Sequence, residues 1–66
     1  MRYYFTLVVH RDRVDELLDA VKLKFKLKPY NGGGDKYNKL SFDFFCYSAK
    51  KKTEVIKFGK IFLNKL

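Results

Sequence analysis

The segment from Arg2 to Phe25, RYYFTLVVHRDRVDELLDAVKLKF, contains the change of hydrophobic period that decides the fold. Its first nine residues are mostly aromatic or β-branched, which is typical of a β-strand. In a strand, alternate side chains point to opposite faces. One face would carry Tyr3, Phe5, Leu7 and Val9, and the other would carry Tyr4, Thr6, Val8 and His10. Because both sets are largely apolar, the pattern predicts a central strand over residues 2–10.

After this strand the apolar residues follow a helical period. They recur at i, i+3, i+4, i+7 and i+11, which are Val14, Leu17, Leu18, Val21 and Phe25. Asp12 is a suitable N-cap, and Asp15 and Glu16 fall in the first turn, where the helix dipole favours acidic side chains. We therefore expect a helix over residues 12–22.

The next stretch, KLKFKLK over residues 22–28, alternates four lysines with three apolar residues. This period predicts a second strand that ends at Pro29, with Leu23, Phe25 and Leu27 on one face. The opposite face would present a row of lysines, Lys22, Lys24, Lys26 and Lys28. Such a row either protects an exposed edge from pairing or binds a polyanion.

Three consecutive glycines interrupt the chain in YNGGGDK, residues 30–36. Glycine adopts positive φ at little cost, so this segment predicts a flexible hairpin tip. A phosphate-binding glycine loop would lie between a strand and a helix, whereas strand-like sequence flanks this one on both sides. The following YNKLSFDFFCYS, residues 37–48, predicts the third strand. One face of this strand would carry Leu40, Phe42, Phe44 and Cys46. The opposite face would carry Ser41, Asp43, Phe45 and Tyr47.

The C-terminal part of the chain predicts a second helix. AKKK, residues 49–52, is expected to be a connection, and TEVIKFGKIFLNKL, residues 53–66, gathers its apolar side chains on one arc, with Ile61 outside it. Thr53 is the expected N-cap, and Lys60 and Lys65 suit the negative end of the helix dipole. Gly59 falls on the apolar face, where it would allow a neighbouring element to pack closely.

The element order β-α-β-β-α predicts a single α+β domain over residues 1–66. A right-handed crossover that leaves a gap for the third strand gives an antiparallel sheet of order 1-3-2, with both helices on one face. This is a ferredoxin-like arrangement without its last strand. The covered face is expected to hold Tyr3, Phe5, Leu7, Val9, Leu23, Phe25, Leu27, Leu40, Phe42, Phe44 and Cys46.

The open face would combine aromatic rings with the lysine row, in a chain of formal net charge +8. Bases of single-stranded nucleic acid stack on aromatic rings while lysines contact phosphates. The sequence therefore predicts a small, non-enzymatic module that binds nucleic acid, with single strands favoured. The expected binding residues are Lys22, Lys24, Lys26, Lys28, Tyr4, Phe45, Tyr47, Lys50, Lys51 and Lys52.

Two other functions fit the same pattern. The chain could instead bind and modulate a larger nucleic-acid-handling protein machine, as a phage host-takeover or anti-defence protein would. An exposed aromatic patch also marks protein interfaces, including that of a homodimer. The many Lys, Phe, Tyr and Asn residues are typical of an A/T-rich genome too, so part of the lysine excess is open to explanation by composition alone.

The residue types that carry catalysis are sparse. His10 is the only histidine and Cys46 the only cysteine. We expect His10 to be a capping or surface residue, and Cys46 to be inert because it points inward. Asp12, Asp15, Glu16 and Asp19 share the solvated face of the first helix rather than forming a metal site. We therefore expect no enzyme, cofactor or metal, and we expect a cytoplasmic location, because no signal peptide or membrane span is visible.

Overall fold

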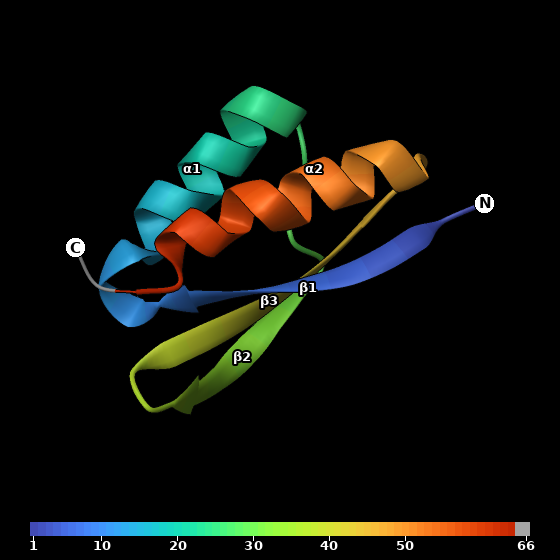
Figure 1. Cartoon of the computed structure of the whole chain (residues 1–66). Coiled ribbons are helices and arrows are strands. Elements are labelled where there is room, and N and C mark those ends of the chain that lie inside the picture. Colours follow the sequence, from blue (N-terminus) through green and yellow to red (C-terminus); the bar gives the residue numbers. More distant parts are fainter. Residues whose placement is uncertain (65–66) are drawn as a thin grey trace.

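The computed structural model describes residues 1–64, and at Asp35 and Lys36 it describes the backbone only. The sheet consists of β1 (Tyr3–His10), β2 (Asn31–Lys36) and β3 (Lys39–Cys46), and the helices are α1 (Val14–Phe25) and α2 (Ala49–Gly59). Short 3-10 turns precede α1 (η1, Arg11–Arg13) and follow α2 (η2, Lys60–Phe62). The strands are antiparallel in the order β1-β3-β2, and both helices cover one face of the sheet (Figure 1). The predicted fold class is confirmed.

The first strand lies at the edge of the sheet, so its predicted central position is wrong. β3 is the central strand, and β1 pairs with it in one continuous register from Tyr3↔Cys46 to His10↔Lys39. Both faces of β1 are apolar for different reasons. Its odd-numbered residues pack under the helices, and its even-numbered residues lie on the open face of the sheet.

The first helix begins later and ends later than predicted. His10 Nδ1 accepts a hydrogen bond from the Asp12 backbone N–H at 3.1 Å, so His10 and not Asp12 caps this region. At the other end the helix continues to Phe25, whose ring packs edge-on against Phe58 with 5.6 Å between centroids. KLKF forms the last turn of the helix because lysine and leucine are good helix formers and because the helical period buries Phe25. This stabilises the helix more than the alternation in KLKFKLK would stabilise a strand. The predicted second strand over 22–28 is therefore wrong, and Leu23 is left 78% exposed instead of buried.

The second strand is formed by the glycine segment that was predicted to be a turn. The hairpin turn lies instead at Tyr37 and Asn38, where φ is 55° and 63°. Two consecutive residues with positive φ give the turn whose twist matches that of a hairpin. The absence of a side chain at Gly32 serves packing, because a Cβ there would lie 2.7 Å from Cδ1 of Phe42.

The second helix begins four residues before its predicted start. Ser48 caps it by accepting a hydrogen bond from the Lys51 backbone N–H at 3.2 Å, so residues 49–52 form its first turn rather than a connection. The close packing expected at Gly59 is confirmed, since a Cβ there would lie 2.9 Å from Cδ2 of Leu7. The predicted end of this helix is wrong, since α2 ends at Gly59 and a 3-10 turn follows over Lys60–Phe62. The helical prediction for residues 65 and 66 falls outside the described residues.

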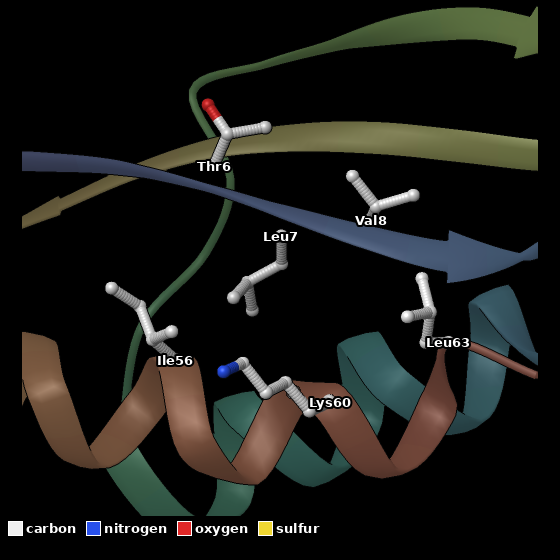
Figure 2. A pocket seen from close by; sticks show the side chains of 7 residues that line it. Thr6, Leu7, Val8, Ile56, Lys60 and Leu63 are labelled. Carbon is white, nitrogen blue, oxygen red and sulfur yellow. The ribbon is translucent and has the colours of Figure 1, made fainter.

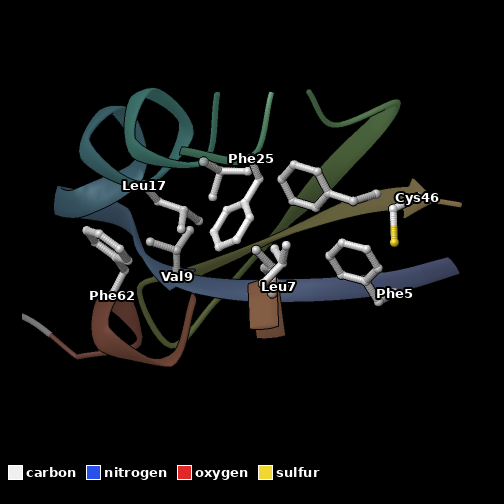
Figure 3. Close-up of a cluster of buried hydrophobic side chains, with 10 residues drawn as sticks. Phe5, Leu7, Val9, Leu17, Phe25, Cys46 and Phe62 are labelled. Atoms are coloured by element: carbon white, nitrogen blue, oxygen red, sulfur yellow. The ribbon is translucent and has the colours of Figure 1, made fainter. Parts of the chain in front are cut away.

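The core lies between the sheet and the two helices (Figure 3). The rings of Phe5 and Phe44 stack in it with 5.6 Å between centroids. Its buried apolar residues are Phe5, Leu7, Val9, Leu17, Val21, Phe25, Phe44, Cys46, Val55 and Phe62. The predicted covered face is thus right for β1 and β3. Among residues 1–64, neither helix has the length and apolar character needed to span a bilayer.

One charged side chain, Arg13, lies at the border of this core. Its guanidinium donates hydrogen bonds to both carboxylate oxygens of Glu16 at 3.0 and 3.2 Å and to the Ile61 carbonyl at 2.7 Å. It also lies over the ring of Phe62, 4.7 Å from the centroid. Arg13 therefore connects the start of α1 to the segment after α2.

Candidate nucleic-acid interface

Four aromatic side chains lie together on the face of the sheet opposite the helices, and we call them the aromatic cluster: Tyr4, Tyr30, Phe45 and Tyr47. Tyr4 and Phe45 are register partners on β1 and β3, with 5.7 Å between ring centroids. The Phe45 centroid also lies 5.9 Å from that of Tyr30 and 5.8 Å from that of Tyr47. Phe45 is therefore the centre, and the three tyrosines around it are 53%, 55% and 69% exposed, in the order Tyr4, Tyr30 and Tyr47.

Arg2 adds a positive charge to this cluster. The guanidinium carbon lies 5.1 Å from the centroid of the Phe45 ring. Hydrogen bonding to the Tyr4 side chain, and then the proximity of Tyr47, raises the pKa of Arg2 above its ordinary value. The aromatic cluster thus has a permanently charged, planar cation against its central ring.

A polar region bounds the aromatic cluster on the same face. The Asp43 carboxylate accepts a hydrogen bond from the Thr6 hydroxyl at 2.6 Å and another from the Asn31 amide at 3.1 Å. The Ser41 hydroxyl donates to the Gly33 carbonyl at 3.0 Å. Both carboxylate oxygens of Asp43 accept hydrogen bonds within the sheet, so this carboxylate is held in a fixed position beside the aromatic cluster.

Lysines meet the aromatic cluster at one end of the sheet. A hollow of about 430 Å³ is lined by Lys26, Lys28 and Lys51 together with Phe45 and Tyr47, and we call it the basic cleft. Its remaining lining residues are Leu27, Cys46 and Ser48. Positive charge and aromatic surface are therefore continuous here, because the same two rings belong to the aromatic cluster and to the cleft.

The fold explains why these lysines converge. α1 ends at Phe25, and the left-handed conformation of its C-cap Lys26 (φ 57°, ψ 40°) turns the chain away from the helix. The segment 27–30 then crosses from the helical layer to the sheet (Figure 1). α2 starts at Ala49, directly after the end of β3, which places Lys51 beside the same crossing.

Two further hollows extend the basic surface. One, of about 520 Å³, shares Lys26, Ser48 and Lys51 with the basic cleft and adds Lys24, Phe25, Lys50 and Glu54. The other, of about 530 Å³, is lined by Lys22, Leu23, Lys26 and Lys28. Lys26 lines all three hollows and is the residue on which the basic surface is centred.

The structure distributes the predicted site residues differently from the sequence prediction. Tyr4, Phe45 and Tyr47 come together as predicted. The prediction of a row of four lysines along one strand is wrong, since Lys22 and Lys24 lie in the last turn of α1. Lys24 Nζ lies 5.0 Å from the centroid of Phe58, on the helical side of the molecule. Of the lysines after β3, Lys51 joins the basic cleft, Lys50 lines the adjoining hollow, and Lys52 lines none of the three.

Two members of the site were missed. Tyr30 was predicted to lie in a turn, but its backbone N–H donates to the Asp43 carbonyl at 2.9 Å, which brings its ring onto the open face. The strand preference of tyrosine was the available signal. Arg2 lay inside the predicted first strand, and the alternation of that strand already put it on the face of Tyr4.

The residues suited to catalysis are engaged elsewhere. The Cys46 thiol is buried and donates to the Ser48 carbonyl at 3.2 Å, and His10 Nδ1 accepts from the Asp12 backbone. Among the side chains that the structure describes, no three of histidine, cysteine, aspartate or glutamate gather as metal ligands would. The described surface therefore offers stacking and positive charge.

No family model, no curated protein and no solved structure matches the chain.

Proposed function

We propose that this protein is a small module that binds single-stranded nucleic acid through the aromatic cluster and the basic cleft. One observation carries the proposal. Phe45 and Tyr47 belong to the aromatic cluster and also line the cleft that holds Lys26, Lys28 and Lys51. A base stacked on the exposed ring of Tyr47 would therefore have its phosphate within reach of a lysine.

The energetics favour single strands. Each base stacked on an aromatic side chain contributes about 1–3 kcal/mol, and this term tolerates any base. Exposed rings on an open sheet face reach bases that are unpaired and unstacked, whereas the bases of a duplex stack on one another. The net charge of +8 adds an attraction to phosphate that falls as salt rises.

The proposal is one of binding without catalysis. The side chains of the aromatic cluster and the basic cleft stack on bases and attract phosphates, and Asp43, the acid beside them, is held by Thr6 and Asn31. Arg2 would act with the lysines, since it places a cation against the ring at the centre of the aromatic cluster.

The proposal is tested by fluorescence anisotropy with a labelled oligothymidylate of about twelve nucleotides and with a duplex of equal length. We expect tighter binding of the single strand and a 5- to 150-fold loss of affinity in Tyr47→Ala, the equivalent of about 1–3 kcal/mol. Tyr37→Ala is the matched control, because Tyr37 is an exposed tyrosine in the hairpin turn, outside the aromatic cluster. Equal affinities of the two variants, or no binding by the native chain, would contradict the proposal.

A further inference from the structure

The outer edge of β1 presents backbone groups that no strand in the described residues pairs. The Arg11 N–H donates to the Asn38 carbonyl at 2.9 Å, so odd-numbered residues of β1 direct their backbone groups to β3. The backbone groups of the even-numbered residues then point outward at Tyr4, Thr6, Val8 and His10. Within residues 1–64 the sheet has no strand beyond β1 on this side.

This edge lacks the features that usually prevent pairing with another chain. Residues 3–9 contain no charged residue and no proline, and their register with β3 has no bulge. Native edge strands are normally protected by such features. An eight-residue apolar edge without them is suited to accepting an added strand.

An apolar hollow of about 230 Å³ runs beside the same edge (Figure 2). Its lining is formed by Thr6, Leu7 and Val8 of β1 and by Ile56, Gly59, Lys60 and Leu63. Leu7 points from β1 toward α2, between Ile56 and Leu63 (Figure 2). An added strand would direct every second side chain into this hollow, so those side chains should be apolar.

Charge indicates the kind of partner. Lys60 lies in the apolar lining, with its amine directed across the hollow toward Ile56 (Figure 2), and Lys57 lies one turn earlier on α2. A second copy of the chain would bring another net charge of +8 and a second Lys60 to the same edge. An acidic segment would meet attraction there instead.

We propose that the outer edge of β1, with this hollow, binds an extended segment of another protein whose hollow-facing side chains are apolar except for one carboxylate opposite Lys60. The segment adds a fourth strand beside β1, pairs with the backbone of Thr6 and Val8, and places a carboxylate at Lys60. This surface differs from the aromatic cluster and the basic cleft, so the inference does not rest on the proposed function.

The test uses a synthetic heptapeptide, Thr-Val-Thr-Glu-Thr-Val-Thr blocked at both ends, whose hollow-facing side chains are Val, Glu and Val, and amide hydrogen exchange followed by NMR. In the free protein the Thr6 and Val8 amides should exchange fast, and those of Leu7 and Val9 slowly. Millimolar peptide should slow Thr6 and Val8 at least tenfold and leave Leu7 and Val9 unchanged. The same peptide N-methylated at every residue keeps its side chains but cannot donate hydrogen bonds, and it should give no protection.

A charge exchange tests the role of Lys60. Lys60→Glu should weaken binding of this peptide about fivefold or more and improve binding of the same peptide with Lys in place of Glu. Lys22→Glu changes the net charge equally, on α1, and should have a smaller effect. Unprotected Thr6 and Val8 amides, equal effects of the two variants, or a dimer with these amides already protected would each overturn the proposal. The oligonucleotide affinity of Lys60→Glu is measured in parallel. It reports on the aromatic cluster and the basic cleft alone, so failure of the peptide to bind and failure of the proposed function can be told apart.

Discussion

The guanidinium carbon of Arg2 lies 5.1 Å from the centroid of the Phe45 ring, at the centre of the aromatic cluster. A cation over a ring face is favoured by about 0.5–1 kcal/mol at an exposed site. The contact leaves Tyr4 and Tyr47 more than half exposed on either side. In our account Arg2 supplies the phosphate contact at the start of β1, while Lys26, Lys28 and Lys51 supply those at the basic cleft.

Arg2→Gln should weaken binding of a single-stranded oligonucleotide about three- to tenfold. One phosphate contact would be lost, so the slope of log affinity against log salt should become shallower by about 0.7. Fluorescence anisotropy at several salt concentrations gives both quantities. Arg11→Gln removes the same charge beyond the other end of β1 and serves as the control. An equal loss in both variants would leave Arg2 without a specific role.

The pair Lys28→Gln and Lys51→Gln should reduce the same salt slope by about 1.4, because each lysine would lose one phosphate contact. The matched control is the pair Lys57→Gln and Lys60→Gln, which removes the same charge from the end of α2 and the start of η2, away from the basic cleft. Its slope should stay close to that of the native chain. If the two double variants gave the same slope, only the total charge would matter, and the basic cleft would have no special part in binding.

Phe62→Ala should destabilise the fold by about 3–5 kcal/mol, because a buried ring is replaced by a cavity. Phe62 is 5% exposed, contacts Phe58 with 5.5 Å between centroids and lies under Arg13. Ile61→Ala is the adjacent control, since Ile61 is 60% exposed and should cost much less. Urea unfolding measures both free energies. A Phe62→Ala variant as stable as Ile61→Ala would show that η2 is not docked on the core.

Acid should weaken the fold partly through Glu16. Its hydrogen bonds with Arg13 lower the pKa of the Glu16 carboxyl in the folded state. A carboxyl with a lowered folded-state pKa stabilises the fold above its unfolded-state value, and this contribution is lost as pH falls through the folded-state pKa. In Glu16→Gln, the fall in Tm between about pH 6 and pH 3 should therefore be smaller than in the native chain.

Asp19→Asn changes the net charge equally and retains the hydrogen bonds of Arg13 to Glu16, so it is the control for general charge repulsion at low pH. Its fall in Tm should resemble that of the native chain more closely than the fall in Glu16→Gln does. Identical acid profiles in Glu16→Gln and the native chain would show that the Arg13–Glu16 pair does not contribute to the pH dependence.

The order of the elements could be predicted from the sequence because β1, β3 and the two helices each have one dominant period, although the second strand was predicted at residues 22–28 and lies at Asn31–Lys36. The two faces of β1 and β3 followed from alternation alone, and burial of Phe44 and Cys46 agrees with it. KLKFKLK was ambiguous, since Phe25 fits the helical series from Val14 as well as the alternation of a strand. The contact between Phe25 and Phe58 decides between them, and it joins segments far apart in the sequence.

The positions of Tyr4, Phe45 and Tyr47 could be predicted because they follow from the alternation of side chains along a strand. The positions of the lysines could not, because they depend on where α1 ends. The lysines were misplaced because extending α1 to Phe25 moves Lys22 and Lys24 onto a helix. Tyr30 was missed because a run of three glycines is the stronger local turn signal, although the turn lies at Tyr37 and Asn38. Packing of the Phe42 ring over Gly32, which a sequence does not show, accounts for the glycine there.

The most direct measurement of our central claim is an NMR titration of protein carrying ¹³C-labelled aromatic rings with a single-stranded oligonucleotide at low salt. We predict that the ring signals of Tyr4, Tyr30, Phe45 and Tyr47 shift together with one dissociation constant, since stacked bases lie over these rings. The signals of Tyr37, outside the aromatic cluster, should stay in place. No saturable shift of the ring signals of the aromatic cluster, or shifts confined to other rings, would contradict the account.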